Sequence, residues 1–222
     1  MLYQILSGQM SPTEIVALLI ALVLGISVHE FSHAAAATWL GDTLPGRQGR
    51  LTLAPAAHLD VMGSLMFLVG GFGWGKPVQF NPYALRMNPR TGSAIVALAG
   101  PVSNLVLAAL VSIPVRLLVF AAGTRGVFFS NGPERILLEL LLGIVTYNLV
   151  LAVFNFIPIF PLDGFSILLG VLPAEMAYQF EQTRQWGIFL LFGLLFLGGY
   201  VPVIGAILYE PVGVLTRLFT GF

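Results

Sequence analysis

The amino-acid sequence predicts an all-α polytopic membrane protein. Hydrophobic residues make up 57% of the 222 residues and charged residues only 9%, whereas soluble domains carry about 25% charged residues. The ten basic and ten acidic residues cancel, so no net charge favours binding to nucleic acid. The absence of cysteine excludes disulfides and thiolate metal sites. The sequence has no internal repeat and no linker, so we expect one domain over residues 1–222.

Four long apolar runs are candidates for membrane-spanning helices. The first, Ile15–Leu40, has 26 residues and is about 39 Å long as a helix, enough to cross a bilayer with some tilt. The others are Gly92–Ala122, Ile136–Ile159 and Trp186–Leu208. We therefore expect about four spanning helices, with six spans as the alternative if two shorter stretches also cross.

Those shorter apolar stretches, Met62–Phe72 and Ile167–Leu172, fall below the roughly 17 residues that a crossing requires. Basic residues flank Met62–Phe72 on both sides, so the positive-inside rule favours a re-entrant hairpin over a span. The stretches Arg47–Pro55 and Lys76–Pro82 mix alternation with glycine and proline, which is typical of short strands or extended loops.

The distribution of basic residues also predicts the orientation. No lysine or arginine precedes the first apolar run, and Arg47 and Arg50 follow it. The positive-inside rule therefore places the N-terminus outside and the C-terminal end of this run in the cytoplasm.

Ionisable side chains inside a span are costly, by roughly 2.5–3.5 kcal/mol each at the bilayer centre, and therefore indicate function. The first run contains His29-Glu-Phe-Ser-His33. His29 and His33 are four residues apart, so both imidazoles lie on one helix face and can bind one metal ion. Glu30 lies about 100° around the helix, where a general base for water is expected beside a metal. The alternative is a polar patch that joins two helices, which needs one polar group rather than three.

A catalytic zinc site needs a third protein ligand. The candidates are His58, the remaining histidine of the chain, and Asp163 in Asn155-Phe-Ile-Pro-Ile-Phe-Pro-Leu-Asp-Gly164. The prolines and the glycine around Asp163 would end a helix and let the carboxylate turn inward. The alternative is an ordinary helix end at which Asp163 caps the next helix. With the histidine pair already in the chain, we favour Asp163 as a ligand.

Together, the motifs at residues 29–33 and 155–164 resemble the paired signature of the site-2 proteases, HExxH followed by NxxPxxxLDG. The resemblance implies an intramembrane zinc metalloprotease with one Zn²⁺ bound by His29, His33 and Asp163 and with Glu30 as the catalytic base. The implied reaction is hydrolysis of peptide bonds in or near the transmembrane helix of a membrane-protein substrate in the lipid bilayer. We expect a compact bacterial-type member without a PDZ domain, located in the cell membrane with its active site toward the cytoplasm.

Three further residues are candidates around the site. Gly100-Pro-Val-Ser-Asn104 resembles the GxxxN motif of the family, and Asn104 and Asn155 are candidates to hold the substrate backbone or to stabilise the oxyanion. The alternative for both is hydrogen bonding between helices. His58 is a candidate gate or a residue close to the metal ligands, and its alternative is a side chain at the membrane interface. Its segment is similar to one in compact bacterial members, but it has Val61 where they usually have proline.

Other classes of function fit the sequence less well. The main alternative is a catalytically silent membrane scaffold or chaperone with the same fold, but Glu30 has no packing value in an apolar helix. A di-iron oxidase or desaturase needs more histidines than the three present. A transporter needs paired charges on several helices, whereas the ionisable residues here converge on one site.

Overall fold

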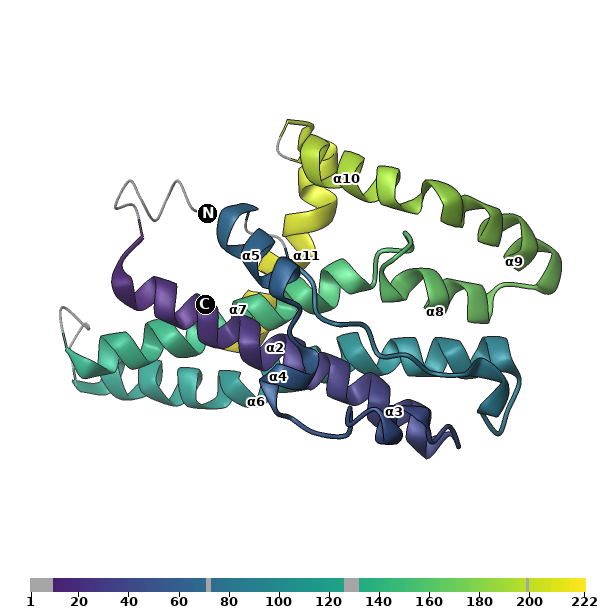
Figure 1. Cartoon of the computed structure of the whole chain (residues 1–222). Helices are drawn as coiled ribbons and strands as arrows, with labels where there is room; N and C mark the ends of the chain where they lie inside the picture. The colour runs from purple at the N-terminus through teal and green to yellow at the C-terminus, as the bar shows by residue number, and fades with distance from the viewer. Residues whose placement is uncertain (1–9, 71–72, 126–131, 199) are drawn as a thin grey trace.

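The computed structural model describes residues 10–70, 73–125, 132–198 and 200–222. Its framework is three long helices that pack against one another: α2 (Pro12–Trp39), α6 (Pro89–Arg125) and α7 (Pro133–Asn155) (Figure 1). α2, α7 and residues Pro89–Ala121 of α6 are long and apolar enough to cross a membrane. The described residues contain no β-strand. The prediction of an all-α polytopic membrane protein is therefore confirmed.

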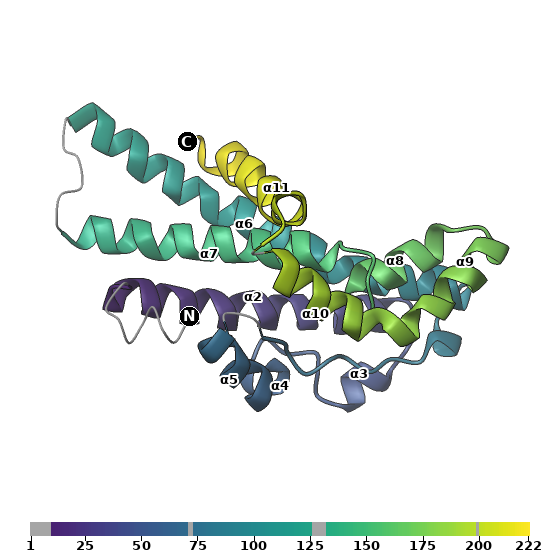
Figure 2. The same ribbon diagram turned by 90° about the horizontal axis from the view of Figure 1, so that it is seen from above.

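Shorter helices surround this framework. Viewed from above, the segment with α3, α4 and α5 lies on the side of α2 that faces away from α6 and α7, and α8 to α10 gather near one end of the long helices (Figure 2). The shorter helices are α3 (Leu44–Arg47), α4 (Pro55–His58), α5 (Val61–Gly70), the 3₁₀ helix η1 (Pro82–Ala84), α8 (Asp163–Val171), α9 (Ala174–Glu181), the 3₁₀ helix η2 (Gln182–Trp186), α10 (Gly187–Gly198) and α11 (Pro202–Thr220).

Small residues spaced four apart explain the close packing of α2 and α6. Residues at this spacing form one ridge along a helix, and small side chains on a ridge let two helix backbones approach closely in a membrane. The buried ridge of α2 is Ala17, Ala21, Gly25, His29, His33 and Ala37. The buried ridge of α6 is Val96, Gly100, Asn104, Ala108 and Ser112.

The apolar runs of the sequence correspond to helices with one exception. Ile15–Leu40 and Gly92–Ala122 match α2 and α6, and α7 ends at Asn155, before Pro158. The expectation of one spanning helix over Trp186–Leu208 is wrong, because α10 ends at Gly198 and α11 begins at Pro202. Proline removes a helical N–H and forces the preceding residue into an extended conformation, as observed for Val201 (φ −105°, ψ 109°).

The segment predicted to be re-entrant is a hairpin built on α5, although residues 71 and 72 of Met62–Phe72 lie outside the described residues. α5 has ten residues, about 15 Å, half of the hydrocarbon thickness of a bilayer. The two ends of the hairpin meet, because Leu59 and Gly75 form an isolated antiparallel bridge and the Lys76 N–H donates to the His58 carbonyl at 2.7 Å. The polypeptide therefore enters and leaves the hairpin at neighbouring positions.

The two stretches predicted to be short strands or extended loops are loops in the structure. No strand forms between Arg47, which ends α3, and Pro55, which begins α4. Residues 76–81 likewise form no helix or strand before η1 begins at Pro82. Ile167–Leu172 belongs mostly to α8, a helix of nine residues.

Candidate metal centre

The two histidines of α2 lie on its buried ridge, where the preceding positions hold alanine and glycine. Each is 8% exposed, because the ridge faces the neighbouring helices rather than the outer surface. Their rings are perpendicular, with centroids 4.6 Å apart. The small residues at positions 17, 21 and 25 bring the helices together, and the same ridge then places both imidazoles inside the protein.

Hydrogen bonds fix which nitrogen of each imidazole carries the proton. The Nδ1 atom of His33 lies 2.7 Å from the Val96 carbonyl oxygen, which can only accept, so Nδ1 donates. The Nδ1 atom of His29 lies 2.7 Å from Asn104 Oδ1. That oxygen faces the ring because Asn104 Nδ2 donates to the Gly25 carbonyl at 3.0 Å. In its neutral form, each imidazole therefore presents an unprotonated Nε2 on its other side.

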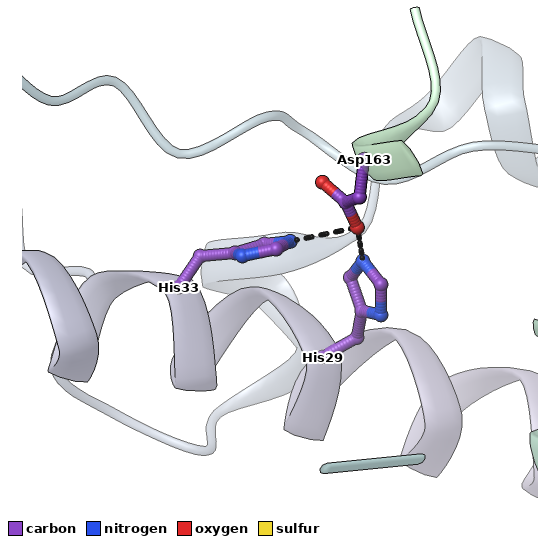
Figure 3. A group of neighbouring side chains, drawn as sticks. All are labelled: His29, His33 and Asp163. Atoms are coloured by element: carbon purple, nitrogen blue, oxygen red, sulfur yellow. Dashed lines mark ion pairs between the residues drawn. The ribbon is translucent and has the colours of Figure 1, made fainter. Parts of the chain in front are cut away.

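The third side chain of the cluster comes from the start of α8. Asp163 Oδ2 lies 3.0 Å from His29 Nε2 and 3.3 Å from His33 Nε2 (Figure 3). The three residues offer ligand atoms that all lie within 4.8 Å of one another. The helix cap is Leu162 and Asp163 is the first residue of α8, so the alternative in which Asp163 caps the helix is wrong.

Contacts at both ends of α8 hold Asp163 in place. Gly164 packs against the end of α7, where a Cβ atom would lie 2.4 Å from the carbonyl oxygens of Phe156 and Ile157. At the other end, Arg90 of α6 donates to the Leu172 carbonyl at 2.7 Å. The carboxylate is therefore placed by a short helix that is fixed to α6 and to the turn that follows α7.

The cluster fits a zinc ion by the chemistry of its ligand atoms. Two Nε2 lone pairs and one carboxylate oxygen converge, and Asp163 Oδ2 is buried without a conventional hydrogen bond. A metal ion among the three atoms would bind both lone pairs and satisfy this oxygen at once. Zinc binds nitrogen and oxygen at about 2.0–2.1 Å, so two ligands of a tetrahedral site lie about 3.3 Å apart. The distances of 3.0 and 3.3 Å from Asp163 to the imidazoles match this spacing.

Glu30 lies beside the cluster and is held by the loop that follows α5. Its Oε2 atom accepts a hydrogen bond from the Val78 N–H at 3.2 Å. The side chain is half-buried and lines the same cavity as His29, His33 and Asp163. The carboxylate is thus near the cluster but outside its set of three ligand atoms.

The cavity that contains these side chains has a volume of about 850 Å³. It lies between α2, α5 with the loop after it, α6, α7, α8, α10 and α11, and most of its lining is apolar. Its apolar and aromatic lining includes Phe67, Tyr147, Phe154, Leu191, Phe192 and Tyr209. The imidazoles and carboxylates of the cluster and Glu30 are thus gathered at one place in an otherwise apolar cavity.

Gly100 and Asn104 both contact the imidazoles, and each has a different role. These two roles explain the GxxxN pattern in physical terms. A Cβ atom on Gly100 would lie 2.5 Å from Cε1 and Nε2 of His33 and 2.6 Å from Cε1 of His29. The absence of a side chain at position 100 therefore leaves room for both rings, and one turn later the amide of Asn104 orients His29.

The other predicted site residues differ in how they are placed. Asn104 is fully buried behind His29 and does not line the cavity, whereas Asn155 does. The prediction of His58 as a gate or as a residue close to the metal ligands finds no support in the lining of the cavity, which does not include it. His58 is fully buried, and its Nε2–H donates to the Thr52 carbonyl at 2.6 Å. His58 instead joins two loops on the outer side of α2.

Two contributors to the site were missed by the sequence analysis. Asn148 of α7 accepts a hydrogen bond from Asn104 at 2.8 Å, and its position as an amide within the apolar run Ile136–Ile159 was a usable signal. The Val96 carbonyl had no such signal, because a backbone group leaves no trace in residue identity.

Comparisons with known proteins give related chains of one kind. A Bacillus subtilis protein named "Putative zinc metalloprotease YwhC" is 38% identical over 195 residues, which cover 85% of this chain and 86% of that protein. Two proteins named "Putative zinc metalloprotease Rip2" are 31% identical over 179 residues in Mycolicibacterium smegmatis and 30% identical over 208 residues in Mycobacterium tuberculosis. They are matched over 64% and 74% of their lengths, and over 78% and 88% of this chain. No protein-family model and no solved structure matches the chain.

We predict that Gly100→Ala weakens zinc binding at least ten-fold, because the new methyl group displaces one or both imidazoles. The measurement is a zinc titration of the purified protein against a competing chromophoric chelator. Gly123→Ala is the matched control on the same helix, since nothing lies within 4 Å of a Cβ atom there. Equal zinc affinity in the two variants would show that Gly100 does not make room for the rings.

Proposed function

Because the chain belongs to the family of zinc metalloproteases that includes YwhC and Rip2, we propose that it is a zinc-dependent intramembrane endopeptidase of the site-2 protease type. It hydrolyses peptide bonds in or near the transmembrane helix of membrane-protein substrates. One observation carries the proposal: His29, His33 and Asp163 converge beside Glu30 in a cavity between helices that are apolar enough to span a membrane.

One Zn²⁺ per chain is the ion that these ligands would hold through the Nε2 atoms of His29 and His33 and the carboxylate of Asp163. Bound zinc supplies a Lewis acid that polarises the scissile carbonyl and makes water more acidic. Three protein ligands leave one tetrahedral position open, which is typical of catalytic rather than structural zinc sites.

Glu30 is the general base in this proposal. Its carboxylate takes a proton from the attacking water and then returns that proton to the amine of the leaving peptide. The Val78 N–H, which donates to Glu30 Oε2, holds the carboxylate in position.

The cavity sets a requirement on the substrate. A helix with its side chains is about 10–12 Å across, and its carbonyls are bonded to amides four residues on. A substrate helix must therefore unwind before one of its carbonyls is available for hydrolysis. We propose that Asn155, which lines the cavity, contacts the unwound backbone, and that Asn104, which lies behind His29, does not.

We also propose that the site lies toward the cytoplasmic side of the cell membrane. Arg47, Arg50, Lys76, Arg86 and Arg90 lie in the segment between α2 and α6 or at its ends, and basic loops remain in the cytoplasm. His33 is six residues from the end of α2 at Trp39, about 9 Å along the helix. In this proposal the cluster lies within the membrane, close to its inner surface.

We predict that Glu30→Gln lowers proteolysis at least about 100-fold while zinc stays bound, because the variant loses the base and keeps the ligands. The assay uses purified protein reconstituted with a panel of single-span membrane proteins, together with metal analysis of each variant. Glu175→Gln is the matched control, since Glu175 is exposed on α9. Cleavage by Glu30→Gln at the wild-type rate would refute this mechanism. A wild-type protein that binds zinc but cleaves no member of the panel would favour the silent scaffold.

We predict that residues on both sides of the α5 hairpin face the cytoplasm. The chain has no native cysteine, so Gln48→Cys, Tyr83→Cys and Glu134→Cys each introduce a single thiol at an exposed position. A membrane-impermeant thiol reagent should label position 134 in intact cells, and positions 48 and 83 only after permeabilisation. Labelling of 48 and 83 from opposite sides would contradict the re-entrant arrangement.

A further inference from the structure

A chain of buried amides leads from α7 through α6 to the metal-binding face of α2. It begins at Asn148, whose Nδ2 donates to the Ile144 carbonyl at 2.8 Å. Asn148 Oδ1 accepts from Asn104 Nδ2 at 2.8 Å, and Asn104 Oδ1 accepts from His29 Nδ1 at 2.7 Å. Asn104 and Asn148 are both 0% exposed. This series of hydrogen bonds thus joins α7, α6 and α2 at a single level.

The direction of every bond in this chain is fixed by backbone carbonyls. The Ile144 carbonyl can only accept, so the amide of Asn148 points its nitrogen there and its oxygen toward Asn104. The oxygen of Asn148 and the carbonyl of Gly25 together take both hydrogens of Asn104 Nδ2. The remaining oxygen of Asn104 must then face His29, which places the proton of that ring on Nδ1 and the lone pair on Nε2.

We infer that Asn148, through Asn104, is a positioning residue for His29 that holds its Nε2 lone pair aimed at the metal. The inference rests on the proposed function, because it assumes that His29 binds zinc. It goes further by making metal binding depend on α7, a helix that supplies no ligand atom to the cluster.

Loss of the Asn148 acceptor has a specific consequence in this site. One N–H of Asn104 would be left buried without a partner, and such a group is costly where water is excluded. The amide would rotate or shift to find another acceptor and would no longer hold His29 in one orientation. Partners that orient metal-bound histidines typically change metal affinity by about 10–100-fold when they are removed.

The packing around Asn148 leaves little room for a substitute. A Cβ atom on Gly25 would lie 2.8 Å from Cδ1 of Leu151 and 3.2 Å from Oδ1 of Asn148. α7 therefore approaches α2 at this level because position 25 is glycine, and the amide chain lies within a tightly packed interface.

The test is a double-mutant cycle on zinc affinity in the purified full-length chain, with Asn104→Leu, Asn148→Leu and the double variant. We expect Asn104→Leu to raise the zinc dissociation constant about 10–100-fold and Asn148→Leu about ten-fold. The double variant should bind no more weakly than Asn104→Leu, because the second change acts through the first. Asn148→Asp, which keeps a carboxyl oxygen as the acceptor for Asn104, should bind zinc more tightly than Asn148→Leu.

Ser112→Ala is the matched control, since Ser112 is buried on the same ridge of α6 and donates within its own helix to the Ala109 carbonyl. Its zinc affinity should equal that of the wild type. If Asn148→Leu does not fold, Asn148→Ala replaces it in the cycle, because it removes the acceptor without adding volume.

Two results would overturn the inference while leaving the proposed function intact: wild-type zinc affinity in a folded Asn148 variant without the acceptor, or effects of the two changes that multiply in the double variant. A wild-type protein that binds no zinc would overturn the proposed function and this inference with it.

Discussion

The convergence of three lone pairs at His29, His33 and Asp163 is the interaction on which the rest of the site depends. The neutral imidazoles and the carboxylate present only lone pairs to one another when they are set to bind a cation, so the surrounding structure must hold them together. The ridge of small residues on α2 and α6 brings the helices close enough for the imidazoles to be buried, and Gly100 leaves the space that the rings occupy. The packing of α8 against α6 and against the turn that follows α7 then brings the carboxylate to the imidazoles.

The apolar surroundings explain why so many neighbouring polar groups are paired. In a membrane the alternative to a protein hydrogen bond is no bond at all, which costs several kcal/mol for each group. His29 is paired with Asn104, His33 with the Val96 carbonyl and Glu30 with the Val78 N–H. Each of these partners fixes an orientation as well as satisfying a donor or an acceptor. The apolar surroundings therefore require hydrogen bonds that also fix the orientation of each side chain in the site.

Much of the fold and of the site can be predicted from the sequence. The features that cannot be predicted have one cause in common. Hydrophobic runs locate α2, α6 and α7, and the spacing of His29 and His33 puts both rings on one face, because both signals are local. The break between α10 and α11 was missed because mean hydropathy stays high across Pro202. The burial of His58 and the contact between Asn104 and Asn148 depend on how distant segments pack, which local spacing cannot reveal.

The central claim is that one zinc ion is held by two imidazoles and one carboxylate. The most direct measurement is the zinc X-ray absorption spectrum of the purified protein, together with its metal content. We expect one zinc per chain, with two imidazole nitrogens and oxygen ligands at about 2.0–2.1 Å. Three imidazoles, which would require His58 as a ligand, or a shell of oxygen ligands without imidazole, would contradict it.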